Sequence, residues 1–385
     1  MNNSKQKIRI GMVGGGQGAF IGNVHRIAMR ISDRYSLEAA CFSSDPLRAA
    51  VSSEEIGIPA NRSYPDFQTM AQAEAAIENG IAAVVIVTPN HLHFPIAKCF
   101  LEHGIHVICD KPLTMTSAET SELINISERV GKHVFVTYNY TGYPMIREAR
   151  ERVRCGDLGE IRIVQVEYSQ DWLATALEQS GQKQASWRTD PKQAGAAGCL
   201  GDIGVHAFNL AHFVSGITPI KIAADLHSFV HGRVLDDHAQ VFMRYANGAR
   251  GSLLSSQVAV GKENHLRLQI FGDKGSLDWC QEQPNQLSFS TLDGAMQILS
   301  RARHQISQAS RNVSLIPAGH PEGYLEAFAV LYREFANILA EPVKPHVGAN
   351  SNAEHSAIPA YLDLCFIEAC IASSAQDSTW VSLKT

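Results

Sequence analysis

The feature that most constrains this chain is a glycine-rich turn between its first apolar strand and its first helix. In IRIGMVGGGQGAFIGNVHRIA, the strand predicted over Ile8–Val13 runs into five glycines within nine positions, namely Gly14, Gly15, Gly16, Gly18 and Gly22. Glycine lets the backbone turn sharply and approach a pyrophosphate, whose charge the N–H groups of a helix N-terminus stabilise. The turn therefore predicts a dinucleotide-binding βαβ unit. The gap from Gly16 to Gly22 is longer than GxGxxG allows, which leaves open which glycines meet the phosphates.

Short apolar strands alternate with helical patterns through the first third of the chain. The predicted strands are Ile8–Val13, Leu37–Phe42, Ala82–Thr88, His106–Cys109 and His133–Thr137. The predicted helices cover Val24–Ser32, Phe94–His103 and Ser117–Val130. This alternation is typical of a parallel sheet covered by helices, so we predict a doubly wound Rossmann fold with its ligand at the carboxyl ends of the strands.

The pattern changes after about residue 145 to long strands joined by hairpin turns. Asn247-Gly248 and Asp273-Lys274-Gly275 each separate two strand-like segments. We predict a Rossmann domain over residues 1–142 and, over 143–385, an α+β domain with a large, mostly antiparallel sheet for substrate binding and oligomerisation. Within the second domain, 301–322 is predicted as a long loop and Gly323–Leu339 as a helix.

Composition excludes several classes of function. With 33 Lys and Arg against 38 Asp and Glu, the net charge of −5 argues against nucleic acid or an anionic membrane as the main partner. The longest apolar stretch, which begins at Ile81, is too short to span a membrane, and the N-terminus lacks the apolar region of a signal peptide. We therefore expect a cytoplasmic protein. The eight cysteines are scattered along the chain, and we expect them to be reduced. His91 and His93 lie two residues apart, but the sequence shows no further metal ligands near them, so no metal is predicted.

The second strand ends in CFSSDP, where Rossmann domains select between NAD and NADP. NAD-preferring domains usually place an acid here, but the predicted tip residue is Ser43, followed by Ser44. Arg48 is able to pair with a 2′-phosphate. Asp45 would favour NAD if it turns inward, or act as a helix N-cap. The sequence leaves the choice between NAD and NADP open.

Downstream of the second strand, the chain contains three residues whose chemistry suits proton transfer: Lys111, Asp202 and His206. Removing a hydride from a secondary alcohol requires removal of the hydroxyl proton, and the imidazole of His206 titrates in the right range. Lys111, in CDKPLT, would stabilise the developing oxyanion. Asp202 lies four residues before His206, so on a helix the two share a face. Without Lys111, His206 would read as a core histidine.

The strings VIVTPNHLHFPIA, GIHVICDKPLT and GDIGVHAFN together resemble the glucose-fructose oxidoreductase, inositol dehydrogenase and MocA family, over nearly the whole chain. The resemblance implies that Asn90 and His91 contact the nicotinamide ribose and pyrophosphate. It also implies that Lys111 lies beside the nicotinamide and that Asp202 and His206 supply the acid and base. The chain departs from the family in three ways: Asp110 replaces a Glu, the glycine loop is longer, and Asn209 replaces a common Asp.

The predicted site follows from these arguments. The catalytic residues are Lys111, His206 and Asp202. The predicted cofactor-binding residues are Gly14, Gly16, Gln17, Gly18, Phe20, Ile21, Ser43, Ser44, Arg48, Thr88, Pro89, Asn90, His93, Asp110, Lys111 and Asn139. Aromatic and polar side chains that suit a sugar ring complete the substrate site, which comprises Lys111, Tyr140, Trp172, Trp187, Arg188, Asp202 and His206.

We therefore predict an NAD(P)-dependent oxidoreductase that transfers a hydride between a nicotinamide cofactor and a secondary hydroxyl of a sugar, inositol or related polyol. One alternative is an NAD-dependent glycosidase that oxidises its sugar transiently and eliminates a substituent. A second is a dinucleotide sensor without catalysis, which would need the glycine loop but no acid/base set. The expected partners are a small-molecule substrate and further copies of the chain in a dimer or tetramer.

Replacing Ser43 by Asp should shift cofactor selectivity toward NAD, because the new carboxylate would repel a 2′-phosphate. Removing the charge of Arg48 should act in the same direction if that residue binds the phosphate. The measurement is the ratio of kcat/KM for NAD and NADP. An unchanged ratio in both variants would show that the second strand ends elsewhere.

Overall fold

The structure is a computed structural model that describes residues 7–340 and 356–384. The chain forms two compact units. The first contains Met1–Tyr138 and Phe328–Tyr361, and the second contains Asn139–Ala327 and Leu362–Thr385. These units differ from the predicted domains 1–142 and 143–385 mainly because a later helix returns to the first unit. The predicted functional division into those two domains stays a prediction.

The first unit contains a five-stranded parallel sheet in the order β2-β1-β3-β4-β5. Its strands are β1 (Ile8–Gly14), β2 (Tyr35–Cys41), β3 (Ala83–Val87), β4 (His106–Cys109) and β5 (Val134–Val136). The order reverses between β1 and β3, which is where doubly wound folds bind ligands. The central strand β3 is buried along its whole length, as expected when helices cover both faces of a sheet. The Rossmann prediction is confirmed.

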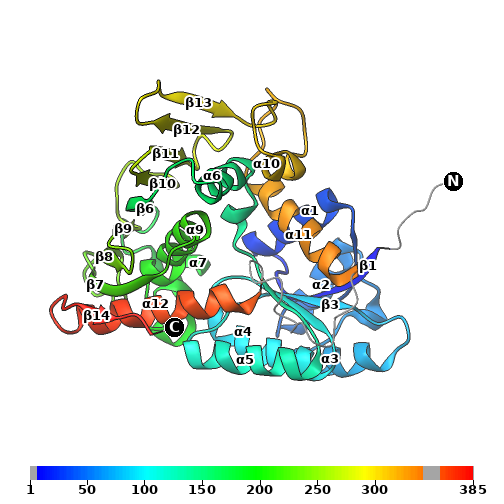
Figure 1. The fold of residues 1–385 in the computed structure, drawn as a ribbon. Coiled ribbons are helices and arrows are strands. Elements are labelled where there is room, and N and C mark those ends of the chain that lie inside the picture. The colour runs from blue at the N-terminus through cyan, green and yellow to red at the C-terminus, as the bar shows by residue number, and fades with distance from the viewer. Residues whose placement is uncertain (1–6, 341–355, 385) are drawn as a thin grey trace. The chain divides into compact units, whose positions relative to one another are not determined.

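Helices connect the strands of this sheet, with short 3₁₀ turns between them. They are α1 (Phe20–Ser32), α2 (Pro46–Ile56), α3 (Phe67–Ala76), α4 (His93–Glu102) and α5 (Ser117–Val130), with turns at Ala60–Arg62 and Asn90–Leu92. The helices α3, α4 and α5 lie side by side on one face (Figure 1). Their ends carry expected signals: a Thr116 and Glu119 capping box begins α5, and Gly131 ends it.

The other face receives most of α11 (Tyr324–Ala340), which comes from far along the sequence (Figure 1). Phe335 stacks on Phe135 of β5, with ring centroids 4.6 Å apart. The hydroxyl of Tyr332 lies 2.7 Å from Nδ1 of the fully buried His25 on α1. These contacts explain why the helix predicted at Gly323–Leu339 joins the first unit.

The second unit contains a nine-stranded sheet in the order β13-β12-β11-β10-β6-β9-β8-β7-β14. Its strands are β6 (Ile161–Ser169), β7 (Pro219–His227), β8 (His238–Tyr245), β9 (Arg250–Ser256), β10 (His265–Gly272), β11 (Gly275–Cys280), β12 (Gln286–Thr291), β13 (Gln297–Ser300) and β14 (Val381–Ser382). Only β6 and β9 pair in parallel; the other neighbours are antiparallel. The predicted turns at Asn247-Gly248 and Asp273-Lys274-Gly275 join β8 to β9 and β10 to β11.

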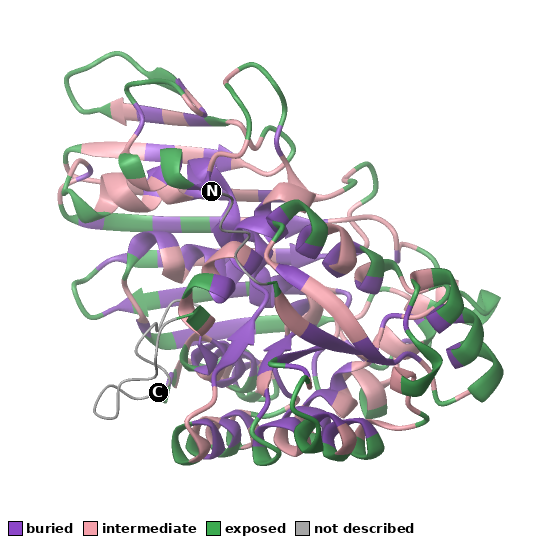
Figure 2. Ribbon diagram, turned by 90° about the vertical axis from the view of Figure 1, so that its right-hand side faces the viewer, coloured by how far each residue is buried: buried purple, intermediate pink, exposed green. Residues whose placement is uncertain are grey.

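Buried and exposed residues alternate along these strands, so one face of the sheet is covered (Figure 2). The helical elements of this unit are α6 (Pro144–Arg154), α7 (Lys183–Arg188), α8 (Pro191–Ala194), α9 (Val205–Ser215), α10 (Gln308–Val313) and α12 (Ala357–Ser374), with 3₁₀ turns at Asn139–Gly142 and Leu177–Ser180 and a π-helical turn at Leu200–Gly204. The helices α6 and α9 contact each other, and α9 packs on β6.

The segment 301–322, predicted as a loop, contains the short helix α10. The buried Arg301 orders this segment through an ion pair with Glu322 and hydrogen bonds to the carbonyl oxygens of Ile316 and Pro317.

Among the described residues, one helix, α12, is long and apolar enough to cross a membrane. Its buried residues include Phe366, which stacks on Phe208 of α9 at 3.9 Å, as expected for a core helix.

Acid should destabilise the first unit. Burial lowers the pKa of His25 to about 4 and that of His106 to about 3, and Nδ1 of His106 accepts a hydrogen bond from the backbone N–H of His133. The folded state thus disfavours protonation that the unfolded chain accepts below about pH 6.5. The stabilisation is present above that pH and is lost as the pH falls toward the folded pKa values. At pH 5 we expect a loss of about 2 kcal/mol from His25.

The loss should appear as a lower urea midpoint at pH 5 than at pH 7. His106→Gln should reduce this difference, because it removes one of the titrating rings while keeping an acceptor for the His133 N–H. Equal midpoints at the two pH values would contradict the assignment.

Candidate active site

The glycine loop lies where β1 and β3 emerge from the sheet. Gly14 is paired with Val87, and a Cβ atom built on Gly14 would lie 2.9 Å from Cγ2 of Thr88. Gly14, Gly15 and Gly18 have positive φ angles of 80°, 75° and 77°. These are conformations that residues with side chains rarely adopt, so the loop needs glycine there.

The last glycine of the motif has a packing role. The helix α1 begins at Phe20, two residues earlier than Gly22, so Gly22 lies inside its first turn. A Cβ atom on Gly22 would lie 2.4 Å from Cα of Gly15. Gly22 thus permits close contact between helix and strand, which explains the long gap from Gly16. A Cβ on Gly16 would meet Oγ of Ser52 on α2 at 2.8 Å, so Gly16 too is held closely by protein.

The loop and the neighbouring strand ends fit a dinucleotide. A hollow of about 410 Å³ opens over the loop; its lining includes Gly16, Gln17, Gly18, Phe20 and Arg26. The N-cap of α1 is Ala19, whose side chain makes no capping hydrogen bond. At the end of β3, Oγ1 of Thr88 and Nδ1 of His91 are buried and have no hydrogen-bond partner among the described residues. Unsatisfied donors and acceptors at this edge suit the phosphates and ribose of a dinucleotide.

Asp45, which follows the end of β2, acts as the N-cap of α2. Its carboxylate accepts a hydrogen bond from the backbone N–H of Arg48 at 3.0 Å and caps α2, as one of the two sequence readings had it. Oγ of Ser43 accepts a hydrogen bond from the Asp45 N–H. Arg48 and Ser44 are exposed, and Nε of Arg48 lies 4.0 Å from Asp45.

The strand ends of β3 and β4 are joined by His93. One ring nitrogen lies 2.8 Å from the carbonyl oxygen of Pro112 and the other 2.9 Å from that of Thr88. Burial lowers the pKa of His93, while the two carbonyl contacts oppose this shift. Both nitrogens therefore face backbone, and His93 supports the segment that carries Lys111. A direct contact between His93 and the cofactor stays a prediction.

Lys111 follows β4 and precedes Pro112 across a cis peptide bond. The carboxylate of Asp110 accepts hydrogen bonds from the backbone N–H of Lys111 and from Oγ1 of Thr137, both at 3.0 Å. Asp110 thus orders the backbone at Lys111. The shorter acid still performs this role, although the resemblance would place a Glu here.

In the second unit, His206 is the second residue of α9 and is buried beside tyrosines. Its ring lies edge-on to Tyr140, with centroids 4.9 Å apart, and 6.3 Å from Tyr168. The two tyrosine hydroxyls are 2.5 Å apart, and that of Tyr168 donates to Oδ1 of Asn264. Oδ1 of Asn264 also accepts from Gln170. His206 is therefore set against a chain of neutral hydrogen-bonding groups.

Asp202 lies in the π-helical turn that precedes α9. Its Oδ2 accepts hydrogen bonds from Nε of Arg188 at 3.2 Å and from Nε2 of Gln257 at 2.8 Å. The guanidinium of Arg188 lies 4.3 Å from the ring centroid of Trp187 and 5.9 Å from that of Trp172. The structure thus joins all four predicted residues of this group, and it adds Gln257, which no sequence signal indicated.

Asp236 is a further residue that the sequence did not reveal. Its carboxylate accepts from the backbone N–H groups of Gly198 at 2.6 Å and Leu200 at 2.8 Å, and its carbonyl accepts from that of Cys199. These bonds satisfy donors at the start of the turn that carries Asp202. Such π-helical turns occur frequently at functional sites.

Two more predicted residues lie in the second unit. Asn139 is buried, and its Nδ2 has no hydrogen-bond partner in the part of the chain that the structure describes. Asn209 donates a hydrogen bond to Asp363 of α12 at 3.0 Å, and both side chains are buried. The substitution of Asn for Asp at 209 therefore serves packing of α9 on α12.

Family comparisons agree with the two units. Residues 8–138 match the model described as an oxidoreductase family with an NAD-binding Rossmann fold, and residues 146–278 match the GFO/IDH/MocA C-terminal domain. An oxidoreductase structure from Sinorhizobium meliloti is 44% identical, with a TM-score of 0.86, and the match covers 98% of this chain and 100% of that one.

Two relatives have informative names. An inositol dehydrogenase homologue from Azotobacter vinelandii, solved with NADH and myo-inositol, is 32% identical with a TM-score of 0.89, and 98% of each chain is covered. The levoglucosan dehydrogenase of Pseudarthrobacter phenanthrenivorans is 26% identical over 98% of each chain.

Gly22→Ala should weaken NADH binding at least tenfold and lower the thermal midpoint, because the new methyl group forces α1 away from Gly15. Gly131→Ala is the matched control: Gly131 has a φ of 64° but open space around its Cβ, so only strain of about 1 kcal/mol is added. Fluorescence titration with NADH measures the binding. Unchanged affinity in Gly22→Ala would contradict the packing role.

Proposed function

The chain belongs to the GFO/IDH/MocA oxidoreductase family, and from that premise we propose that it is an NAD-dependent dehydrogenase or reductase acting on a secondary hydroxyl of an inositol, sugar or related polyol. The observation that carries the proposal is the surroundings of His206. A buried imidazole beside the hydrogen-bonded hydroxyls of Tyr140 and Tyr168, with the carboxylate of Asp202 close to both tyrosines, suits a ligand rich in hydroxyls. The names of the two relatives, one solved with myo-inositol, support this substrate class.

The nicotinamide ring, when bound, accepts or returns the hydride. His206 takes the hydroxyl proton in the oxidative direction. Asp202 orients the substrate or the imidazolium while Arg188 and Gln257 fix its carboxylate. Lys111, whose backbone Asp110 holds, stabilises the oxyanion that develops on the alcohol oxygen. These roles follow from the chemistry of alcohol oxidation, in which one group must accept the hydroxyl proton and another must stabilise the negative charge on the oxygen.

The proposed cofactor preference is NAD. Asp45 caps α2, so its carboxylate is not the acid by which NAD-selective domains bind the ribose, and the proposed preference rests on Arg48 and on the relative's cofactor. Arg48 is exposed, and its guanidinium lies near the carboxylate of Asp45. The negative charge of Asp45 offsets part of the positive charge with which Arg48 would bind a 2′-phosphate. The NADH in the relative's structure supports the same choice.

We also propose that the protein is cytoplasmic and homo-oligomeric. The uncovered face of the nine-stranded sheet exposes apolar side chains, among them Ile163 and Phe242 at 42% and 58% exposure. Apolar exposure on a sheet face is typical of a subunit contact. Light scattering coupled to size-exclusion chromatography measures the oligomeric state directly.

A spectrophotometric screen tests the proposed activity. Inositols, levoglucosan, aldoses and a glycoside are incubated separately with NAD and NADP, and both reduced cofactor and released products are measured. Reduced cofactor formed in proportion to the oxidised polyol supports a dehydrogenase. Product release without net reduced cofactor would indicate the redox-neutral glycosidase reaction instead, and cofactor binding without turnover of any substrate would indicate a sensor.

His206→Asn should lower kcat/KM by about 10²-fold or more and flatten its rise with pH, because an amide does not accept the hydroxyl proton. Lys111→Ala should cause a loss of similar size while NADH affinity changes little. The pH profile of kcat/KM and an NADH titration are the measurements. If His206→Asn retains the parent rate and profile, His206 is a packing residue and Lys111 alone must support proton transfer.

A further inference from the structure

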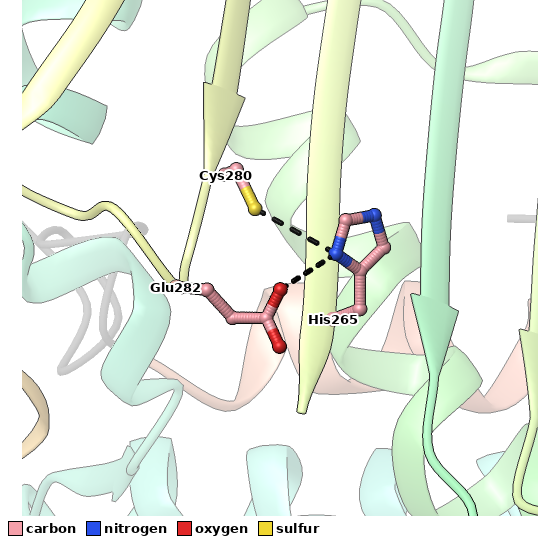
Figure 3. Close-up of side chains that lie close together, drawn as sticks. All are labelled: His265, Cys280 and Glu282. Atoms are coloured by element: carbon pink, nitrogen blue, oxygen red, sulfur yellow. Dashed lines mark hydrogen bonds and ion pairs between the residues drawn. The ribbon is translucent and has the colours of Figure 1, made fainter. Parts of the chain in front are cut away.

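Three chemically different side chains converge at one end of β10 and β11 (Figure 3). Nδ1 of His265 lies 2.8 Å from Oε2 of Glu282 and 3.8 Å from Sγ of Cys280. The three atoms all lie within 4.8 Å of one another. None of these residues has a part in the proposed reaction.

Strand pairing fixes this arrangement. Arg267 on β10 pairs with Cys280 on β11, and continuing the antiparallel register sets His265 opposite Glu282. Cys280 is the last residue of β11 and Glu282 lies in the turn that follows, and both side chains approach His265. Leu266 and Leu268 alternate with the cluster and are buried on the other face. The cluster is therefore held by backbone hydrogen bonds on the uncovered face of the sheet.

The geometry does not suit a nucleophilic cysteine. A general base activates a thiol through one ring nitrogen and is oriented through the other. Here the thiol and the carboxylate both approach Nδ1 of His265. Burial also raises the pKa of Cys280, so its thiol is protonated at neutral pH. A different function must explain why three donor atoms surround one position.

We propose that His265, Cys280 and Glu282 bind a divalent transition metal of the Zn²⁺ class. Nitrogen, thiolate sulfur and carboxylate oxygen are the donors that Zn²⁺ takes. Tetrahedral coordination with ordinary bond lengths needs about 3.6 Å between nitrogen and sulfur and about 3.3 Å between nitrogen and oxygen. The distances of 3.8 and 2.8 Å from Nδ1 lie within about half an ångström of these values, and the sulfur–oxygen separation, which is within 4.8 Å, must close to about 3.6 Å through rotation of the side chains. Glu282 is partly exposed, which leaves a fourth position for water.

The surrounding charges permit a cation. Arg267 lies next to Cys280, but Asp278 engages its guanidinium through two hydrogen bonds. Lys262 acts on Glu282 only as a more distant charge. Metal binding releases the thiol proton and moves the imidazole proton from Nδ1 to Nε2. The thiolate and the carboxylate then offset both charges of the ion, so the site becomes neutral.

The site is adjacent in sequence to the polar network of the second unit. Asn264, which precedes His265, accepts hydrogen bonds from Tyr168 and Gln170. An ion at His265 would therefore order the start of β10 beside that network. The proposal does not rest on the enzymatic activity, and the experiment below requires none.

Titration with Co²⁺ tests the site in the full-length, untagged protein. We expect one equivalent to bind with a thiolate-to-cobalt charge-transfer band, and Zn²⁺ to displace it. Cys280→Ser should abolish the band and weaken Zn²⁺ binding at least about 100-fold, which exceeds typical effects of residues behind the ligands. His265→Gln should also weaken binding. Cys155→Ser, which removes an exposed cysteine elsewhere, is the matched control and should keep the band.

A second measurement avoids variants that fail to fold. In the unmodified protein, Zn²⁺ should slow alkylation of Cys280 at least tenfold and leave that of Cys155 unchanged, as measured by mass spectrometry of the peptides. The proposal is overturned if Cys280 is alkylated at the same rate with and without Zn²⁺, or if folded Cys280→Ser retains both the cobalt band and the affinity.

Discussion

The parallel pairing of β1 with β3 is the constraint on which the first unit depends. This pairing sets Gly14 beside Val87, so the glycine loop and the Thr88 turn leave the sheet at the same edge. The order of strands reverses between these two, which is where doubly wound sheets bind their ligands. Buried polar atoms of Thr88 and His91 then remain without partners among the described residues. The pairing of the two strands and the course of the backbone thus place a site suited to a dinucleotide at this edge of the sheet.

Support residues hold the catalytic candidates in both units. His93 and Asp110 fix the backbone around Lys111, and Asp236 holds the turn that contains Asp202. Each acts through backbone N–H or carbonyl groups. Main-chain anchoring therefore sets the backbone positions of Lys111 and Asp202 through the fold.

The second unit combines neutral and charged recognition on one helix and its preceding turn. Asp202 and Arg188 form a charged group beside two tryptophans, whereas His206 faces tyrosines and, through them, Asn264. A polyol has hydroxyls for the polar groups and a C–H face for the aromatic rings. The other face of the same sheet is uncovered and carries exposed apolar residues and the His265 cluster.

The sequence by itself determined the elements with strong local patterns. The strand predicted at His106–Cys109 and the helix at Ser117–Val130 have the predicted bounds, because apolar periodicity and capping residues are properties of neighbouring positions. The glycine loop, Lys111 and the spacing of Asp202 and His206 were likewise visible as short motifs. The roles of these residues stay predictions.

Only the tertiary structure decided which distant residues meet. Gly22 was visible as a glycine, but its contact with Gly15 depends on how α1 lies on β1. The return of α11 to the first unit, the contact of Asp236 with Gly198 and the convergence of His265 with Cys280 join positions separated by many residues. Such contacts leave no periodic signal in one sequence, because they are set by the packing of whole elements and not by the preferences of neighbouring residues.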